Sequence, residues 1–520
     1  MHCNKIGTNQ KQTMEGVGID DIAVYFPKLH FRIEDFANFR NLDFSKLNKG
    51  LGLESMSIPD VHEDPATMGA NACLRLIERN QLNPKDIGRI YLGTESALDG
   101  AKPTATYIVE MLEQKYGAGS FSHCDVTDLT FACIGGVDAM HNTLDWVTRG
   151  GAENRQGIVV FSDDAKYDLN SPGEYTQGAG AGAMLIKQNP RLMIIEDIWG
   201  VATNPVHDFF KPKRKLALID MVQEVIDLAK ETGVAIPHDV AEKIVALIPK
   251  STKKDNILFQ EEALTIHKDT PVFDGQLSNR CYTEAVKEAF IDFKSKIKQH
   301  TNNEEIITAS WQRIVVHLPY AFQGKRMFPD IFMMDRIHTD EGNAIVKEIG
   351  TDPSLDINHM KSLTPEEQEK AKNAYRRLIS KTSQYQHFTK EKIEKTQKAS
   401  ALVGNQYTGS IFLALMSTLE IDLNDQTDLN YKKIGFCAYG SGAKSKVFQG
   451  ILQPGWDKVV KEFHLFDRLS KRIAIDAKTY EALHRGFQKN SVESPASEFV
   501  LKSIGGSNVL HGHRKYTWIN

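Results

Sequence analysis

Short apolar runs alternate with amphipathic stretches along most of this chain, and this alternation restricts the folds open to it. The runs at 90–95, 157–162 and 182–186 predict strands of a first half, and those at 314–317 and 434–438 predict strands of a second half. Strands that alternate with helices in sequence are typical of an α/β fold. We therefore predict an α/β protein made of two similar halves.

Two glycine- and alanine-rich stretches lie within the first half. Residues 66–79 predict a helix whose small side chains (Ala66, Gly69, Ala70 and Ala72) allow close packing in a core. The Gly-x-Gly-x-Gly run at 178–182 is padded with alanine and lacks the spacing of a dinucleotide- or phosphate-binding loop. We interpret it as a close-packed turn that enters a strand.

Three chemically useful side chains stand where predicted strands end. Cys133 follows a predicted strand at 123–126 and precedes a helix predicted to start near Gly135, while Glu95 and His317 each end an apolar run. A thiol at a helix N-terminus feels the positive end of the peptide dipoles, which favours the thiolate. An imidazole can polarise a carbonyl and a carboxylate can take a proton from carbon. The set predicts acyl transfer through a thioester.

Each of these residues has a plainer interpretation by itself. A lone cysteine before glycines is usually a small core residue near a turn. A histidine that ends an apolar strand is usually a buried group with a satisfied hydrogen bond, and a glutamate there is usually a solvated cap. The segments around the three residues decide between these interpretations.

Those segments resemble hydroxymethylglutaryl-CoA synthase, a family of the thiolase superfamily. The resemblance is carried by Gly-Thr-Glu-Ser around Glu95, Ala-Cys-Ile-Gly-Gly around Cys133 and His-Leu-Pro-Tyr at His317. The matching segments are collinear and extend over most of residues 18 to 470. In chain order they are 18–27, 63–72, 93–96, 132–136, 162–167, 171–181, 208–212, 271–278, 317–320, 404–410 and 439–443.

The resemblance implies a thiolase-like fold, in which two pseudo-repeated α/β halves form five αβαβα layers. It also implies that acetyl-CoA acylates Cys133, and that Glu95 is the general acid/base that makes the acetyl carbanion equivalent. That carbanion attacks the C3 ketone of acetoacetyl-CoA, which His317 orients, and water releases 3-hydroxy-3-methylglutaryl-CoA. We expect no cofactor, because CoA thioesters are the substrates, and no metal.

Further residues fall in segments that contact substrate in the family. Tyr167 and Asn405 are expected substrate contacts, although Tyr167 alternatively only packs and Asn405 only shapes its loop. Ser441 and Gly442 follow the strand at 434–438 and are expected to offer backbone N–H groups to an oxyanion beside the Cys133 amide. The alternative is that the glycines only permit a tight turn.

Basic residues suggest where the CoA nucleotide is held. Lys211 opens the densest basic cluster, 211–215, which would attract phosphates but is equally consistent with a solvated charge run. The family usually has lysine at Phe322, and we expect Lys325 and Arg326 to compensate for it. Val137 stands where the family often has a small hydroxyl residue. These departures bear on substrate preference.

Composition excludes several classes of protein. The chain has 520 residues and a net charge of −4, which argues against a nucleic-acid binder. No apolar run approaches the roughly 20 residues of a membrane helix, and the start lacks a hydrophobic signal core. The six scattered cysteines include no C-x-x-C pair, which argues against a zinc site or disulfides and for a reducing compartment. We expect a cytoplasmic protein.

Two stretches look inserted relative to the usual family length. We predict a thiolase-like N-terminal half at 18–212, a helical insertion at 213–268 and a C-terminal half at 269–520. The C-terminal half contains a charged helical insertion at about 335–400. Thr364 is predicted to cap a helix there. The insertions are expected to be solvated surface helices or, alternatively, a docking surface for a carrier protein or partner enzyme.

Three functions follow from these observations. The first is the synthase acting on free CoA thioesters in the mevalonate route to isoprenoids, as a homodimer. The second is a relative that adds a β-branch to a β-ketoacyl chain on an acyl carrier protein. The third is a non-catalytic scaffold for other condensing enzymes, which would have no physical need to keep Glu95, Cys133 and His317.

Overall fold

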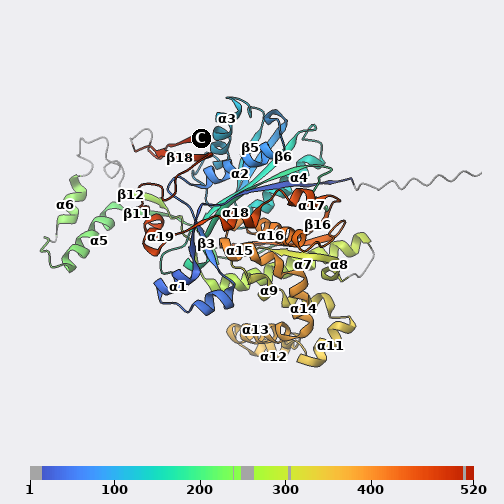
Figure 1. Ribbon diagram of the computed structural model, residues 1–520. Coiled ribbons are helices and arrows are strands. Elements are labelled where there is room, and N and C mark those ends of the chain that lie inside the picture. Colours follow the sequence, from blue (N-terminus) through green and yellow to red (C-terminus); the bar gives the residue numbers. More distant parts are fainter. Residues whose placement is uncertain (1–14, 238, 248–262, 302–305, 507–510) are drawn as a thin grey trace, which may run out of the picture.

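The first half of the chain folds into a mixed sheet with helices on both faces (Figure 1). The fold is seen in a computed structural model that describes residues 15–237, 239–247, 263–301, 306–506 and 511–520. The sheet order is β1-β7-β6-β4-β5; β1, β7 and β6 pair antiparallel, and β6, β4 and β5 pair parallel. The elements are β1 (Val17–Tyr25), α2 (Pro65–Arg79), β4 (Ile87–Gly93), α3 (Thr104–Tyr116), β5 (Asp125–Leu129), α4 (Gly135–Thr148), β6 (Gln156–Ala165) and β7 (Gly178–Gln188).

The second half repeats this pattern. Its strands β8 and β9 pair antiparallel with β16, β16 pairs antiparallel with β15, and β15 pairs parallel with β14. Helix α7 precedes β14 as α2 precedes β4, and α16 precedes β15 as α4 precedes β6. The elements are β8 (Met193–Ile195), β9 (Gly200–Thr203), α7 (Gly275–Thr301), β14 (Trp311–Val316), α16 (Ser410–Asn424), β15 (Lys433–Gly440) and β16 (Lys444–Leu452).

The two halves share one ten-stranded sheet and enclose a common helical layer. β1 pairs with both β7 and β8, which joins the sheets. Helices α4 and α16 meet between them, since a Cβ at Gly136 would lie 2.7 Å from the Thr408 carbonyl oxygen and 3.1 Å from the Phe412 ring. Helices α2 and α3 cover the outer face of the first half, and α7 packs on β9, β16 and β15. The predicted two-half, layered α/β architecture is confirmed.

Two local predictions differ from the structure. The strand expected at 123–126 is β5, Asp125–Leu129, because the apolar side chains of this short parallel edge strand lie further along the chain. The expected turn at 178–182 is the first part of β7, an eleven-residue strand. Its glycines leave room for neighbours, since a Cβ at Gly182 would lie 2.1 Å from the Phe161 ring.

The stretch at 213–268 projects from the body of the molecule as an arm (Figure 1, green). A two-stranded ladder of β11 (Lys213–Ala217) and β12 (Ala263–His267) forms its base, and α5 (Leu218–Glu231) and α6 (Val240–Leu247) lie beyond. The insertion predicted to be helical therefore contains two helices among its described residues, with a strand ladder at its base. Residues 238 and 248–262 of this stretch lie outside the described residues.

The stretch at 335–400 adds a layer of helices whose inner faces join the main core. Its helices are α11 (Asp340–Ile349), α12 (Ile357–Ser362), α13 (Pro365–Lys381) and α14 (Ser383–Lys392), packed on α9 (Gln323–Met327) and α10 (Pro329–Arg336). Ile345, Ile379 and Phe388 are buried against the core. The Thr364 hydroxyl accepts from the Glu367 N–H in a capping box, so the predicted cap is confirmed.

Shorter elements complete the described chain. β2 (Leu29–Arg32), β3 (Ser55–Ile58) and β17 (Ile473–Ala474) form a small sheet beside α1 (Ile33–Arg40) and α19 (Ala477–His484), and β18 (Glu498–Ile504) pairs with β19 (Arg514–Ile519). The others are β10 (Phe209–Phe210), β13 (Val272–Phe273), α8 (Ile307–Ser310), α15 (Lys398–Val403), α17 (Trp456–Val460) and α18 (Leu465–Ser470). Throughout the described ranges, every helix is too short or too polar to cross a lipid bilayer.

Candidate active site

The end of β4 packs directly on the first turn of α4, which brings Glu95 to Cys133. A Cβ at Gly93 would lie 2.3 Å from the Gly136 nitrogen, so only glycine allows this approach. The chain reverses before α4 with Ala132 at a φ of 41°, a conformation that L-residues rarely adopt. Cys133 leaves this tight turn with its side chain 8% exposed.

Asp163, on β6, holds the Glu95 loop in place. Its carboxylate accepts hydrogen bonds from the Glu95 N–H (2.7 Å) and the Thr94 hydroxyl (3.0 Å). It also accepts from the N–H (3.1 Å) and hydroxyl of Thr408, in the turn just before α16. One buried acid therefore ties β4 and β6 of the first half to the second half.

The Glu95 carboxyl occupies an environment that favours its neutral form. Burial raises the pKa of Glu95 to about 7; the Lys211 ammonium opposes this shift, and the negative charge of Asp163 adds to it. Its Oε1 atom is buried without a hydrogen-bond partner. A carboxylate with a pKa near neutrality is suited to exchange protons with a weak acid at physiological pH.

The Cys133 thiol is neutral rather than a thiolate, contrary to the sequence prediction. Burial raises its pKa well above the usual range, and the charge of the adjacent Glu95 carboxylate acts in the same direction. These two effects outweigh the dipole of α4, because a charge in a dry site loses its hydration and meets a like charge nearby. The thiol must therefore lose its proton as it reacts.

Aromatic rings enclose the thiol. Cys133 packs in a cluster with Ala165, Tyr167 and Tyr407. The Tyr167 and Tyr407 ring centroids are 6.3 Å apart, and the Asn405 amide interacts with the Tyr167 hydroxyl. Asn405 Oδ1 also accepts from the Tyr407 N–H at 2.9 Å. Tyr167 and Asn405 therefore both lie at the site, where Asn405 shapes its loop as well as facing Tyr167.

One segment of the first half supplies both a cation and an anchor. Lys211 Nζ donates to the Glu95 carbonyl oxygen (3.3 Å) and lies 4.9 Å from the centroid of the Tyr407 ring. Asp208, three residues earlier, accepts from the Tyr439 hydroxyl (3.0 Å) and the Gly442 N–H (2.8 Å). Lys211 thus enters the site, whereas 213–215 run along the exposed ladder of the arm.

The turn after β15 reaches the Cys133 loop but does not leave both expected donors free. A Cβ at Gly440 would lie 2.6 Å from the Phe131 carbonyl oxygen and 2.9 Å from the Ile134 nitrogen. The Gly442 N–H, however, is bonded to Asp208. The prediction that Gly442 offers its N–H to an oxyanion is therefore not met, because Asp208 already uses that donor. Ser441 lies beside the Tyr439 hydroxyl.

His317 follows β14 on the second half as a buried, neutral imidazole. It is 2% exposed, and burial lowers its pKa to about 3. The Tyr282 hydroxyl donates to the His317 carbonyl oxygen at 2.6 Å, and the two rings meet edge to face. The same Tyr282 hydroxyl is close enough to Cys133 for the two groups to interact electrostatically, so this tyrosine links the two predicted site residues.

Lys325 and Arg326 lie apart from this cluster. They line a second cavity of about 820 Å³ together with residues of α13 and α14. Lys325 Nζ lies 3.4 Å from the centroid of the Phe322 ring, and Arg326 donates to the Gly50 carbonyl oxygen. Val137 is fully buried in the core.

A cavity of about 580 Å³ opens beside the Glu95 loop. Glu95, Lys211, Gln177, Asp269 and His484 line it. Its volume suits a slender, polar chain entering toward Glu95.

Sequence reasoning did not single out Asp163, Asp208 or Tyr407 as site residues. Two adjacent acids within a strand that begins with an apolar run are the one signal that points to Asp163, because burying a carboxylate requires several hydrogen bonds.

Comparison with known proteins identifies the family. The family model described as hydroxymethylglutaryl-coenzyme A synthase N terminal matches residues 13–190, and the model described as its C terminal matches residues 264–499. Together they cover most of the chain. The chain belongs to the hydroxymethylglutaryl-CoA synthase family. It is therefore an acyl-transferring condensing enzyme, and the predicted resemblance is confirmed.

Relatives of similar length support this assignment. The hydroxymethylglutaryl-CoA synthase of Haloferax volcanii is 29% identical over 513 residues, covering 97% of this chain and 100% of that protein. The enzyme of the same name from Enterococcus faecalis is 25% identical over 493 residues, covering 95% of this chain and 97% of that protein.

Solved structures share the fold at lower identity. MvaS in complex with 3-hydroxy-3-methylglutaryl coenzyme A has a TM-score of 0.72 and 23% identity, and covers 98% of this chain and 100% of that one. The curacin biosynthetic pathway HMG synthase in complex with acetyl donor-ACP has a TM-score of 0.67 and 17% identity, and covers 97% and 100%. The thiolase-like fold predicted for the chain is confirmed.

Proposed function

We propose that this chain condenses acetyl-CoA with acetoacetyl-CoA to give 3-hydroxy-3-methylglutaryl-CoA and CoA through an acetyl-Cys133 intermediate. The observation that carries the proposal is the buried pairing of Glu95 with Cys133. Burial raises the pKa of Glu95 to about 7, and its hydrogen bond with Cys133 acts against this rise. Burial and the charge of Glu95 raise the pKa of the Cys133 thiol. The two side chains are hydrogen-bonded to each other, so a proton can pass directly between them. A nucleophile beside a carboxyl of near-neutral pKa is the arrangement that acyl transfer followed by carbon deprotonation requires.

The first stage is acetyl transfer. The Cys133 sulfur attacks the acetyl-CoA carbonyl as it loses its proton, the carbon–sulfur bond to CoA breaks, and CoA leaves as its thiol. The backbone N–H groups of Cys133 and Ser441 are the donors we assign to the carbonyl oxygen as it becomes negative. The surrounding Tyr167 and Tyr407 rings limit the access of water to the new thioester until condensation is complete.

The second stage forms the carbon–carbon bond. The Glu95 carboxylate takes a proton from the acetyl methyl group, and the enolate carbon attacks C3 of acetoacetyl-CoA. His317, which stays neutral, orients that ketone by hydrogen bonding, and protonated Glu95 returns the proton to the new alkoxide. Water then hydrolyses the thioester to Cys133 and releases the product.

A second candidate substrate is a β-ketoacyl chain on an acyl carrier protein. The observation that favours it is the cavity of the second insertion, where Lys325, Arg326, Arg377 and Lys390 face an open groove with Glu394. Carrier proteins are acidic, and Phe322 removes a cation from the position where the family binds free substrate. Both substrates require the same Cys133 and Glu95 chemistry.

The test begins with the covalent intermediate. Purified protein is mixed with acetyl-CoA and quenched, and the peptide that carries Cys133 is weighed. We expect an acetyl adduct in the wild type and in Cys281→Ala, a matched control at another buried cysteine, and none in Cys133→Ala. Absence of the adduct from the wild type would favour the scaffold function.

The second arm separates the two substrates. Acetoacetyl-CoA, or an acetoacetyl group on a phosphopantetheinyl carrier protein, is added to the acetylated enzyme. Discharge by acetoacetyl-CoA into 3-hydroxy-3-methylglutaryl-CoA supports the first proposal, and discharge by the carrier alone supports the second. Glu95→Ala should acquire the acetyl group but condense on the order of 10²–10⁴ times more slowly. Near-normal condensation by Glu95→Ala would remove Glu95 as the base.

We further propose a homodimer that supplies the mevalonate route, as the family resemblance implies. Light scattering of the purified protein tests the dimer directly, since a dimer has twice the 58.4 kDa mass of the chain.

A further inference from the structure

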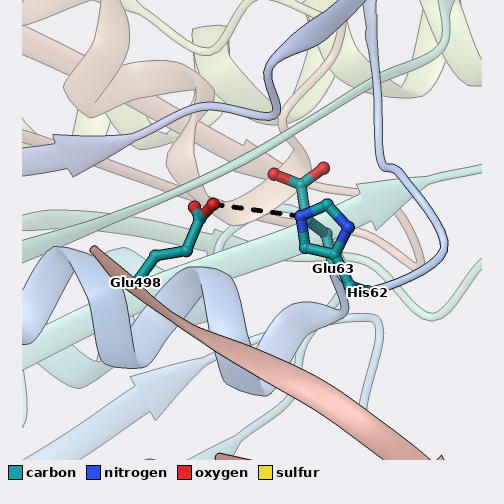
Figure 2. A group of neighbouring side chains, drawn as sticks. All are labelled: His62, Glu63 and Glu498. Atoms are coloured by element: carbon teal, nitrogen blue, oxygen red, sulfur yellow. Dashed lines mark ion pairs between the residues drawn. The ribbon is translucent and has the colours of Figure 1, made fainter. Parts of the chain in front are cut away.

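A second group of convergent polar side chains lies outside the Cys133 site. His62 and Glu63 precede α2, and Glu498 begins β18, 435 residues later in the chain. A nitrogen of His62 and one oxygen of each glutamate lie within 4.8 Å of one another, and all three residues are buried. Figure 2 shows the imidazole edge of His62 turned toward the Glu498 carboxylate.

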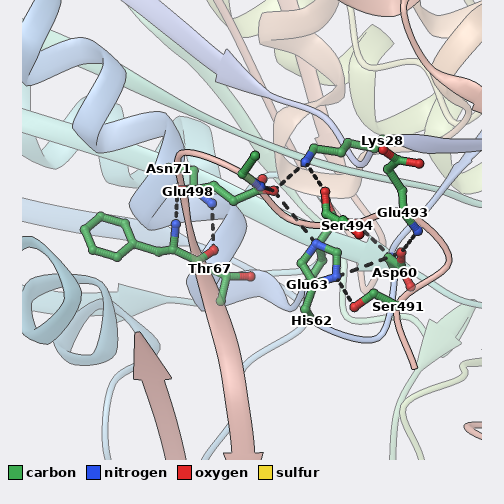
Figure 3. Close-up of polar contacts among 12 residues, drawn as sticks. Lys28, Asp60, His62, Glu63, Thr67, Asn71, Ser491, Glu493, Ser494 and Glu498 are labelled. Atoms are coloured by element: carbon green, nitrogen blue, oxygen red, sulfur yellow. Dashed lines mark hydrogen bonds and ion pairs between the residues drawn. The ribbon is translucent and has the colours of Figure 1, made fainter. Parts of the chain in front are cut away.

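One nitrogen of the His62 ring is held and the other is not. Nδ1 lies 2.8 Å from the Ser491 hydroxyl and 3.9 Å from Asp60 Oδ2 (Figure 3). Nε2 is buried with no hydrogen-bond partner, and its 4.0 Å separation from Glu498 Oε1 is too long for a hydrogen bond. Proteins orient metal-binding histidines in this way, with oxygen atoms fixing one ring nitrogen while the other faces the ion.

The two carboxylates are held in place as firmly as the imidazole. The Tyr25 hydroxyl lies 2.7 Å from Glu63 Oε1 and 2.6 Å from Glu498 Oε2. The Asp60 N–H donates to the second oxygen of Glu63 at 2.7 Å. The three side chains are therefore already directed toward one point.

A cation already stands at this place. Lys28 Nζ lies 2.5 Å from Glu498 Oε1, and the Lys28 side chain is 31% exposed (Figure 3). A lysine on a flexible stem can turn into solvent. Asp60 and Glu63 also line the 580 Å³ cavity, which gives an ion a route to the cluster.

We propose that His62, Glu63 and Glu498 bind a divalent transition-metal ion, zinc being the best match, in place of the Lys28 ammonium. One imidazole nitrogen and two carboxylate oxygens are ligands that Zn²⁺ accepts at about 2.0–2.2 Å. Ligand atoms around a tetrahedral ion at these distances are about 3.3–3.6 Å apart, so the three side chains must move inward from their present separations of up to 4.8 Å to complete the site. The ion would fasten β18 and the C-terminal hairpin to the start of α2.

The test uses the full-length protein, freed of metal with a chelator and titrated with zinc against a chromophoric chelator. The wild type should bind one zinc ion per chain. The His62→Ala and Glu498→Gln variants should bind this ion about 100-fold more weakly or not at all. Glu493→Gln, in the same C-terminal segment but outside the ligand set, is the matched control and should bind as the wild type does. All these proteins keep the same cysteines, so thiol binding cancels. Equal zinc affinity in the wild type, His62→Ala and Glu498→Gln would overturn the proposal.

Lys28→Met separates loss of a ligand from loss of folding. Because the substitution removes the competing ammonium, it should tighten zinc binding by about tenfold, equivalent to about 1.4 kcal/mol, and increase the rise in Tm that zinc produces. Acetylation of Cys133 checks independently that each variant is folded. Unchanged or weaker zinc binding by a Lys28→Met protein that is acetylated normally would also overturn the proposal.

Discussion

At the scale of single residues, the chemistry of Glu95 comes from its surroundings. Its carboxyl group has lost water, faces Asp163 across the loop and is only partly compensated by Lys211. Burial and the charge of Asp163 destabilise the carboxylate, and Lys211 stabilises it, so Glu95 keeps its proton up to about neutral pH. His317 and Cys133 are kept neutral by the same burial. The site therefore begins its reaction without a bare charge on its nucleophile or its imidazole.

The pH dependence of condensation should show the Glu95 titration. With preformed acetyl-enzyme in single-turnover experiments, the rate should fall about tenfold per pH unit below about pH 7 and level off above it. His317, whose pKa is lowered to about 3, should cause no further change of rate between pH 5 and 9. Lys211→Met should shift the fall in rate to higher pH, because the Lys211 ammonium lowers the pKa of Glu95. A rate independent of pH from 5 to 9 would contradict this assignment.

Burial of Glu95 should also lower the free energy of unfolding at and above neutral pH. Its pKa is raised from 4.5 to about 7, so the folded state holds this proton more tightly than the unfolded state and stability falls as pH rises between those values. Glu95→Gln lacks this penalty. Its free energy of unfolding relative to the wild type should rise by about 2–3 kcal/mol between pH 5 and pH 8. Urea denaturation at the two pH values measures this change. If the variant and the wild type differed in free energy of unfolding by the same amount at both pH values, the link between Glu95 titration and stability would be excluded.

At the scale of elements, the contact between β4 and α4 positions the acid and the thiol. The strand end and the helix start touch through backbone atoms at Gly93 and Gly136. A contact between backbones has no side chains that can adjust, so the distance between Glu95 and Cys133 is set by the fold rather than by rotamers.

Gly93→Ala tests this contact. The added methyl group would stand 2.3 Å from the Gly136 nitrogen, so β4 and α4 must separate. We expect a loss of about 1–3 kcal/mol in stability and about 100-fold in condensation rate. Gly100→Ala is the matched control, because its methyl group would meet no atom within 4 Å. Normal condensation by Gly93→Ala would show that the two elements tolerate displacement.

At the scale of the whole molecule, the C-terminal hairpin closes over the first half. The Asn71 side chain on α2 makes the two hydrogen bonds that a neighbouring strand would make. It accepts from the Phe499 N–H at 2.8 Å and donates to the Phe499 carbonyl oxygen at 3.0 Å. Phe499 and Tyr516 pack in the same core cluster as α2 and α3. The hairpin is therefore part of the first half, although the chain reaches it last.

Asn71→Ala should loosen this hairpin. It leaves a buried N–H and a buried carbonyl without partners, which costs about 1–3 kcal/mol for each group. Amide hydrogen exchange should accelerate at Phe499 and its neighbours while β6 and β7 stay protected. Asn279→Ala, which removes an exposed amide bonded within its own helix, is the control and should leave the hairpin unchanged. Unchanged exchange at Phe499 would show that ring packing alone holds the hairpin.

Much of the fold and part of the site could be predicted from local pattern. Alternating apolar and amphipathic runs gave the α/β class, and Thr364 gave a helix start, because periodicity and capping depend on neighbours in sequence. Glu95 and Cys133 were recognisable because each stands where a predicted strand ends and lies within a segment that resembles the family. The glycines from Gly178 to Gly182 were misread as a turn, since glycines inside a strand are explained only by the distant groups that pack against them, such as the Phe161 ring on Gly182.

The sequence by itself determined the order of strands and helices, the family and the residues able to do acyl transfer. The tertiary structure decided the protonation of Cys133, because burial and the Glu95 charge depend on which segments meet. It also decided that Asp208 takes the Gly442 N–H, and that His62 faces Glu498 across 436 positions of the chain. Hydration and electrostatic interaction act through space, so residues distant in sequence set them and no local pattern records them.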